Sequence, residues 1–169
     1  IDEAKLHASF HTVRSAPLVV SLAVSLYERG ELDEAETLLE DSLSIIRQFS
    51  PADWIAQAYL ILSRIKRLRG DNASATHLQN ELDLMGRQFS VPRIAAVVGA
   101  ERARCAVLDN RPEQAVKILK QFNKPGVSDE VADLQLAVSD IESLSLARIR
   151  TNIALKNFDD AQQELQKQI

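Results

Sequence analysis

A few residues have the types that bind metal ions, and their spacing decides what chemistry they could do. His7 and His11 are four residues apart and would share one helical face. Zinc needs three or four ligands, and no glutamate follows His7 as it does in the hydrolytic zinc motif. Asp159, Asp160 and Glu164 could in principle bind magnesium, but they fall where a helix is expected to start. Acidic residues there complement the helix dipole, so no metal site is predicted.

Three further side chains could act as a nucleophile or bind a ligand. Cys105 is the only cysteine, which excludes an internal disulfide. It lies in an apolar helical stretch and is expected to be a buried small hydrophobe. Trp54 is interpreted as a packing residue, with a ligand-stacking surface as the alternative. His77 is isolated in the sequence and expected to be exposed. No acid–base or nucleophilic set converges, and the chain is predicted not to be an enzyme.

The basic run from Arg64 to Arg69 raises the question of nucleic-acid binding. On a helix its charges spread around the axis, and no aromatic residues interleave for base stacking. The whole chain has a net charge of −4 and a pI of about 5.4, which disfavours a nucleic-acid binder. The run is therefore interpreted as a solvated helix face.

The composition indicates the elements that must position these residues. Of 169 residues, 46% are hydrophobic and only 5% aromatic, which is enough apolar material for a core and excludes wholesale disorder. Five Gly and five Pro are few for a β-rich fold, and strong helix formers abound. No apolar run approaches the roughly 20 residues of a membrane span, and no signal peptide is recognised. A single cysteine fits a reducing compartment, so a cytoplasmic location is expected. The chain opens with Ile1, and we expect it to be a fragment of a longer protein.

Four short segments repeat one pattern that ends in alanine. They are residues 30–35, 70–75, 110–115 and 156–161, and their alanines are 40, 40 and 46 residues apart. This near-constant spacing predicts stacked helical hairpins. Gly30, Gly70 and Asn110 suit the left-handed conformation that ends a helix. Asp33, Asp71 and Asn110 are expected to cap the helix that follows. The alanines at 35, 75, 115 and 161 should be buried where the two helices of a hairpin cross.

The pattern predicts helices separated by turns, with no competing strand pattern. Gly86 is expected to interrupt or fray the fifth helix. The helices are expected at residues 2–13, 17–29, 33–48, 52–69, 72–89, 92–108, 112–122, 129–155 and 158–168.

The segment Gly-x-x-x-x-Ala, with a small residue twelve positions before the alanine, resembles the tetratricopeptide repeat. The usual period there is about 34 residues, so these hairpins are lengthened; HEAT-like repeats are the second choice. A series of segments in this chain is similar, in order and spacing, to one regulator family. The segments are residues 26–36, 58–64, 69–71, 86–93 and 100–104, followed by 142–161. That family is the superhelical sensor region of MalT-type, LuxR-family transcription regulators, and the resemblance covers roughly residues 18–168. Lys156 departs from the pattern, because glycine is usual there.

The resemblance implies a region between an N-terminal ATP-binding switch module and a C-terminal helix-turn-helix, which receives an inducer or an inhibitory protein. It also implies that the first helix of each hairpin lines a concave groove. Three arginines recur at one position of the repeat and would suit an anionic partner. The alternative is that each arginine pairs with a carboxylate of a neighbouring repeat, for example Glu101 or Asp109. The groove residues expected on this basis are Tyr27, Leu60, Arg64, Arg67, Arg104, Leu146 and Arg150.

We therefore predict an all-α, right-handed superhelix of stacked hairpins, forming one domain over residues 1–169 with turns near 30, 70, 110 and 156. The predicted function is that of a sensor and protein-interaction region of a transcription regulator. A general tetratricopeptide adaptor that binds a peptide segment is the alternative. The expected partner is a small-molecule inducer, a protein or a peptide, with DNA contacted only through another module. Self-association is possible in this scheme, and no cofactor or membrane contact is expected.

Overall fold

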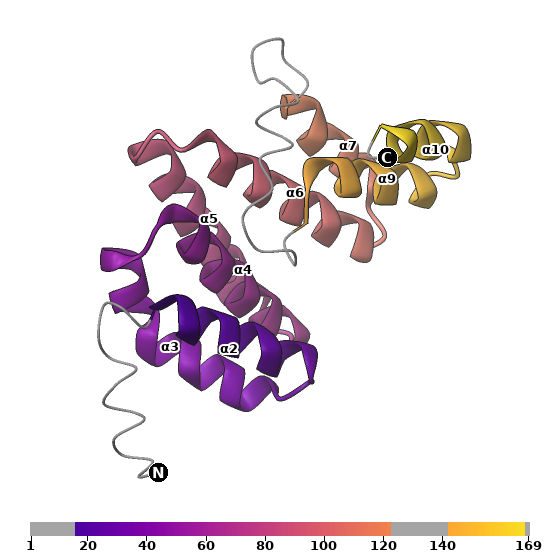
Figure 1. Cartoon of the computed structure of the whole chain (residues 1–169). Coiled ribbons are helices and arrows are strands. Elements are labelled where there is room, and N and C mark those ends of the chain that lie inside the picture. Colours follow the sequence, from indigo (N-terminus) through magenta and orange to yellow (C-terminus); the bar gives the residue numbers. More distant parts are fainter. Residues whose placement is uncertain (1–15, 123–141, 168–169) are drawn as a thin grey trace. The chain divides into compact units, whose positions relative to one another are not determined.

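The computed structural model describes residues 16–122 and 142–167, and all regular elements in these ranges are helices (Figure 1). The chain forms two compact units, residues 1–85 and 86–169, with the boundary near the end of α5. The helices are α2 (Ala16–Glu28), α3 (Leu32–Phe49), α4 (Ala52–Leu68), α5 (Asn72–Gln88), α6 (Pro92–Leu108), α7 (Pro112–Leu119), the 3₁₀-helix η2 (Lys120–Phe122), α9 (Leu144–Ala154) and α10 (Phe158–Gln166).

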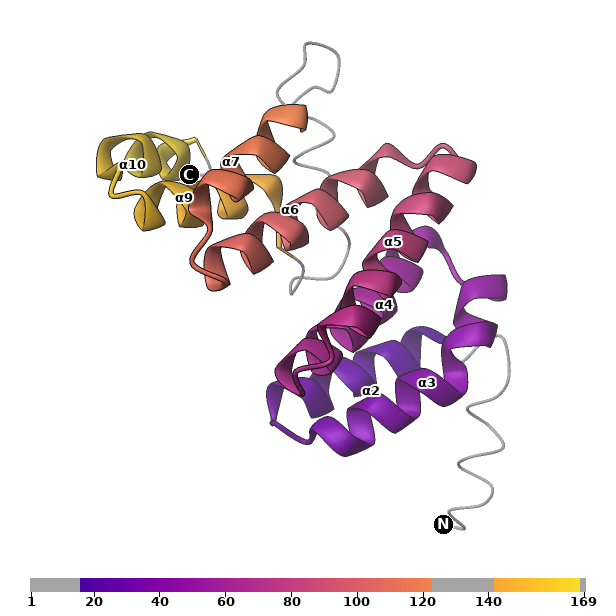
Figure 2. The same cartoon turned by 180° about the vertical axis from the view of Figure 1, so that it is seen from behind.

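In the first unit, α2 and α3 form an antiparallel hairpin and α4 packs against both (Figures 1 and 2). The spacing of the buried residues in α3 explains why this helix packs against α2 and α4. Its buried residues Ala35, Leu39, Ser42 and Ile46 recur at three- and four-residue intervals and form one stripe, as expected for a helix with a single buried face. Helix α4 is buried over most of its length, because it lies between neighbours.

In the second unit, α6 pairs with α7, and α9 pairs with α10 (Figures 1 and 2). Helix α9 also packs against α6 and α7. One apolar cluster joins these helices and is built mainly from alanines and leucines. The small side chains allow the helices to approach closely. In each unit the first helices of consecutive hairpins therefore lie side by side, α2 with α4 and α6 with α9.

Within residues 16–122 and 142–167, five helices end with the same backbone motif. The left-handed residues are Gly30, Gly70, Ser90, Asn110 and Lys156, with φ between 54° and 81°. After each of them, the next residue donates its N–H to the carbonyl five positions earlier, at 2.8–2.9 Å. This is the Schellman motif. The predicted turns at 30, 70 and 110 are confirmed, and Lys156 occupies the same conformation although it is not glycine.

The predicted crossing alanines are buried. Ala35 and Ala115 are fully buried, Ala75 is 3% exposed and Ala161 6%. At the crossing of α4 and α5, the Ser63 hydroxyl donates to the Ala75 carbonyl at 3.1 Å. The amide of Gln79 donates to the same hydroxyl at 3.0 Å. The small residue of the repeat therefore also satisfies buried polar groups here.

Several sequence predictions need correction. The expected helix 129–155 is broken, because residues 142 and 143 are not helical. Ser143 is an N-cap whose side chain accepts from the Leu146 N–H, so α9 starts at residue 144. Gly86 does not interrupt α5, which continues to Gln88. The remaining residues of the expected helix 129–155, up to 141, lie outside the described ranges, as does the expected helix 2–13.

The predicted caps are confirmed at one position and wrong at two. The Asp71 carboxylate accepts from the Ser74 N–H at 3.0 Å and caps α5. Asp33 lies inside the first turn of α3, after the N-cap Glu31, and Asn110 is the left-handed residue itself. The all-α helical class is confirmed for the described residues. No helix among them is long and apolar enough to cross a membrane.

Candidate functional site

Arg104, one of the predicted groove arginines, is held by a carboxylate one turn earlier in α6. Its Nε and Nη2 donate to Glu101 at 3.0 and 2.6 Å, and Glu101 is fully buried. Burial by itself lowers the pKa of Arg104, but the hydrogen bonds and charge of Glu101 outweigh it and raise that pKa above its usual range. The guanidinium therefore neutralises a buried carboxylate, which would be strongly destabilising if left alone.

Arg150, the next arginine of the series, is held in the same way. Its Nε donates to Glu142 at 2.9 Å and its Nη2 at 3.4 Å, and Glu142 is only 4% exposed. The charge of Glu142 also acts on Arg104, so the two pairs form one charged cluster between α6 and α9. Both arginines thus pair with carboxylates, as in that alternative, but each carboxylate is three or eight residues from its arginine and does not come from a neighbouring repeat. Contact of either arginine with a ligand or partner stays a prediction.

The predicted groove residues of the first unit fall into two groups. Leu60 is 1% exposed, so its expected place on a groove wall is wrong and it belongs to the core. Tyr27, Arg64 and Arg67 are half-buried, on the adjacent helices α2 and α4. Arg67 donates to the Asn72 side chain at 3.4 Å. In the second unit, Leu146 is 43% exposed.

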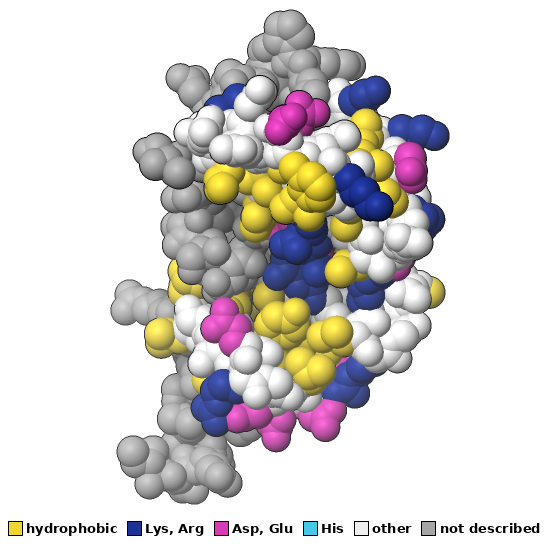
Figure 3. Space-filling view, turned by 90° about the vertical axis from the view of Figure 1, so that its right-hand side faces the viewer, with side chains coloured by type: hydrophobic (Ala, Val, Ile, Leu, Met, Phe, Trp, Pro, Cys, Tyr) yellow, Lys and Arg dark blue, Asp and Glu magenta, His cyan; other side chains and the backbone are white. Residues whose placement is uncertain are grey.

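Two of the four basic residues in the run 64–69 pair with acidic residues of α3. The Lys66 ammonium lies 2.6 Å from Glu36 and 2.5 Å from Glu40. These hydrogen bonds, with Glu36 first, raise the pKa of Lys66. Arg69 pairs with Asp33 and, at 2.9 Å, with Glu36. On the face drawn in Figure 3, basic side chains are likewise interrupted by apolar and acidic ones. The run joins α3 to α4 and does not form a continuous basic surface.

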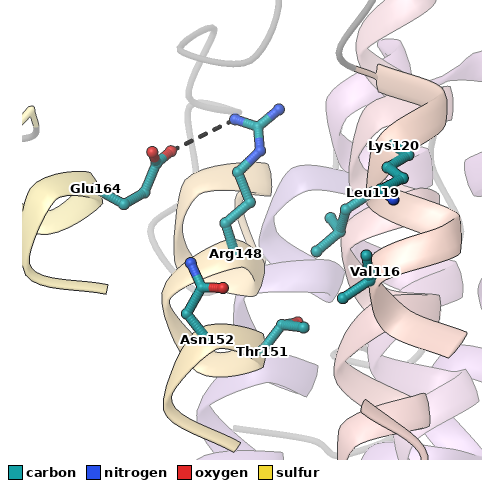
Figure 4. A pocket seen from close by; sticks show the side chains of 7 residues that line it. All are labelled: Val116, Leu119, Lys120, Arg148, Thr151, Asn152 and Glu164. Atoms are coloured by element: carbon teal, nitrogen blue, oxygen red, sulfur yellow. Dashed lines mark hydrogen bonds and ion pairs between the residues drawn. The ribbon is translucent and has the colours of Figure 1, made fainter. Parts of the chain in front are cut away.

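A pocket of about 200 Å³ lies between α7, α9 and α10 in the second unit (Figure 4). Arg148 of α9 and Glu164 of α10 face each other at one side of it, with Nη1 and Oε1 3.5 Å apart. Apolar side chains of α7 form the opposite wall. The lining residues are Val116, Leu119, Lys120, Arg148, Thr151, Asn152 and Glu164.

Sequence reasoning missed this pocket, although the sequence contains a signal for it. Three residues after the crossing alanine, the first three hairpins have the apolar residues Leu38, Leu78 and Ile118. The fourth hairpin has Glu164 at this position. A carboxylate in a column of apolar residues indicates a polar site at this end of the array.

The remaining residues that could do chemistry do not come together in one site. Cys105 is half-buried, with its Sγ 3.8 Å from Glu101 Oε1, so it is less buried than predicted. His77 is exposed as predicted, and Trp54 is half-buried. Asp160 lies in the first turn of α10, as the dipole argument requires. No group of three or more His, Cys, Asp or Glu in residues 16–122 and 142–167 could hold a metal ion. His7 and His11 lie outside these ranges.

Comparison with known proteins agrees with the repeat architecture. The sequence matches the family described as the MalT-like TPR region over residues 2–168. Serine/threonine-protein kinases PknK of Mycobacterium tuberculosis and Mycobacterium bovis are 31% identical to it over 86 residues. That stretch is 51% of this chain and 8% of the kinase, so the chain spans a small part of these relatives. No solved structure matches the chain. With nearly the whole sequence matched and hairpins in both units, the chain belongs to the MalT-like TPR region family.

Proposed function

We propose that the chain is the sensor and interaction region of a MalT-type, LuxR-family transcription regulator in the cytoplasm. In this proposal it binds a small-molecule inducer or a protein or peptide segment, and binding shifts an active–inactive equilibrium in modules outside the chain. Such a shift needs a ligand with different affinity for the two states. DNA is contacted only by the other modules, and the region also takes part in self-association.

The observation that carries the proposal is the family match over residues 2–168. The fold adds a surface, because the first helices of consecutive hairpins lie side by side within each unit. In the first unit this surface includes Tyr27 of α2 and Arg67 of α4, which have the same position in their repeats. A surface that carries both an aromatic ring and a guanidinium can bind a ligand with apolar and anionic parts.

There are two alternatives. A general adaptor that binds a peptide would use the same first-helix surface without any DNA-binding module. A regulatory region attached to a protein kinase is suggested by the relatives, whose name is serine/threonine-protein kinase. The coding sequence around the chain separates these cases. A phosphate-binding loop upstream and a helix-turn-helix downstream support the regulator, whereas a kinase module supports the second alternative.

The test uses the complete protein. Tyr27→Ala combined with Arg67→Gln alters the first-helix surface of the first unit, and Arg29→Gln is the matched control because Arg29 is exposed and pairs with Glu31 in the adjoining turn. Transcription from the promoter that the complete protein binds is measured across growth media. We expect the wild type and the control to respond to the medium, and the double variant to stay at one level with unchanged helicity by circular dichroism. A full response from a folded double variant would contradict binding at this surface.

A further inference from the structure

We propose that the pocket between α7, α9 and α10 binds a small organic carboxylate with an apolar end. The surface residues tested for the proposed function, Tyr27 and Arg67, lie in the first unit, whereas the residues of this pocket come from the second unit alone. The pocket, of about 200 Å³, is below the roughly 300 Å³ at which drug-sized ligands begin to fit. It therefore suits a short-chain acid and is too small for a nucleotide or an oligosaccharide.

The charges of the lining favour an anion. Lys120 and Arg148 contribute two positive charges, and Glu164 contributes one negative charge. The lining therefore has an excess positive charge. Glu164 is already shared, because Lys167 lies 3.0 Å from its other oxygen. A ligand carboxylate would balance this excess charge.

The geometry of the Arg148–Glu164 pair favours an exchange of partners. Their 3.5 Å separation is long for a charge-assisted hydrogen bond, which is usually 2.7–2.9 Å. Both side chains are largely shielded, with 20% and 13% of their surface exposed. A ligand carboxylate at normal distance would interact more strongly with the guanidinium than Glu164 does. Glu164 therefore competes with the ligand, and its charge should weaken binding.

The neutral residues of the lining define the rest of the ligand. Val116 and Leu119 of α7 form an apolar wall opposite Arg148 (Figure 4), which a short hydrocarbon chain would cover. The Thr151 hydroxyl donates to the Ala147 carbonyl at 2.7 Å, so its oxygen remains an acceptor for a ligand hydroxyl. The Asn152 side chain adds an amide donor. Inorganic phosphate has the required charge but cannot cover the apolar wall.

The experiment follows binding to the full chain by amide and arginine-side-chain NMR shifts. The probes are isovalerate, inorganic phosphate and 3-methylbutan-1-ol, which separate the contributions of charge and of the hydrocarbon. With isovalerate we expect saturable shifts around α7, α9 and α10. Phosphate should bind about tenfold more weakly, which corresponds to the loss of about 50 Å² of apolar contact. The alcohol should not bind. Absence of saturable shifts with isovalerate, or equal binding of phosphate, would overturn the proposal.

Variants test the roles of the individual charges. Lys120→Gln should weaken isovalerate binding by about tenfold, the effect of one lost charged hydrogen bond. Glu164→Gln should instead tighten it, because the competing carboxylate is removed. Lys117→Gln, an exposed change on α7 outside the lining, is the matched control and should bind as the wild type does. Weaker binding by a folded Glu164→Gln protein would mean that Glu164 only supports the pocket, and would also overturn the proposal. Regulation by the first-helix surface is measured separately, in the complete protein, so the two proposals can fail independently.

Discussion

Gly86 of α5 and Ile94 of α6 lie so close together that a Cβ at residue 86 would be 2.7 Å from Ile94 Cγ2 and 2.9 Å from Ile94 Cβ. The glycine is needed for this contact, and α5 continues through it. Ile94 is itself buried, so it has little room to move away.

Gly86→Ala should therefore destabilise the protein, although alanine is the better helix former. Overpacking of this kind costs about 1–3 kcal/mol, measured by urea unfolding. In an Ile94→Ala background the same change should cost less, because Cγ2 is gone and the two sites are coupled. Equal costs in both backgrounds would show that the contact does not limit residue 86.

Ala75→Glu should be severely destabilising. Ala75 is 3% exposed at the crossing of α4 and α5, so a glutamate would bury a charge and crowd the contact with Ser63. We expect a loss on the order of several kcal/mol, seen as a lower melting temperature. Ala73→Glu is the matched control, because Ala73 is exposed on the same helix. If the two variants melt alike, the repeat register is wrong.

Lys156→Gly should stabilise the protein. Lys156 has φ 62°, and a side chain in this region costs roughly 1–2 kcal/mol. The greater freedom of glycine in the unfolded chain offsets part of this gain, leaving about 0.5–1 kcal/mol in denaturant unfolding. Lys117→Gly, inside α7, should do the opposite by about 1 kcal/mol. A destabilised Lys156→Gly protein would show that the lysine side chain matters more than its backbone conformation.

Stability should fall in alkaline solution because of Tyr59. This side chain is 1% exposed, and burial, followed by the charge of Glu81, raises the pKa of Tyr59 from 10.0 to about 12. Between these values the unfolded chain has lost the phenol proton and the folded chain retains it, so stability decreases as pH rises.

The test compares the wild type with Tyr59→Phe by urea unfolding. Between about pH 9 and pH 11.5, the wild type should lose about 2 kcal/mol more than the variant. Other groups that titrate in this range are common to both proteins and cancel in the difference. Parallel pH profiles would show that Tyr59 ionises equally easily in the folded and unfolded chains.

The repeat framework was predictable because its signals are local. Glycine is strongly preferred at a left-handed helix end, so the turns at Gly30 and Gly70 could be located directly. At Ser90 the helix boundary was predicted, between the helices expected at 72–89 and 92–108, but the left-handed conformation was not, because serine has no comparable preference for it. Ser143 did carry a capping signal, since serine is among the best N-cap residues.

The candidate site was harder to predict, because it depends on pairings between helices. The register placed Arg104 and Arg150 on adjacent first helices, and this is where they lie. The sequence did not determine that their guanidinium groups would pair with Glu101 and Glu142, because both carboxylates could equally have faced solvent. Leu60 was misplaced for a related reason: α4 packs against several helices, so the apolar residues in its middle, Leu60 included, are all buried.

The five Schellman motifs have a consequence for how such arrays change over time. Each helix is stopped by a backbone conformation that glycine, serine, asparagine and lysine all adopt in this one chain. The helix end can therefore persist while the residue type at this position changes. The energetic cost of a non-glycine residue is confined to one turn. Two related proteins could keep the same arrangement of hairpins with little sequence identity at their turns. Conserved geometry at these positions would then be invisible to a search that looks for a recurring glycine.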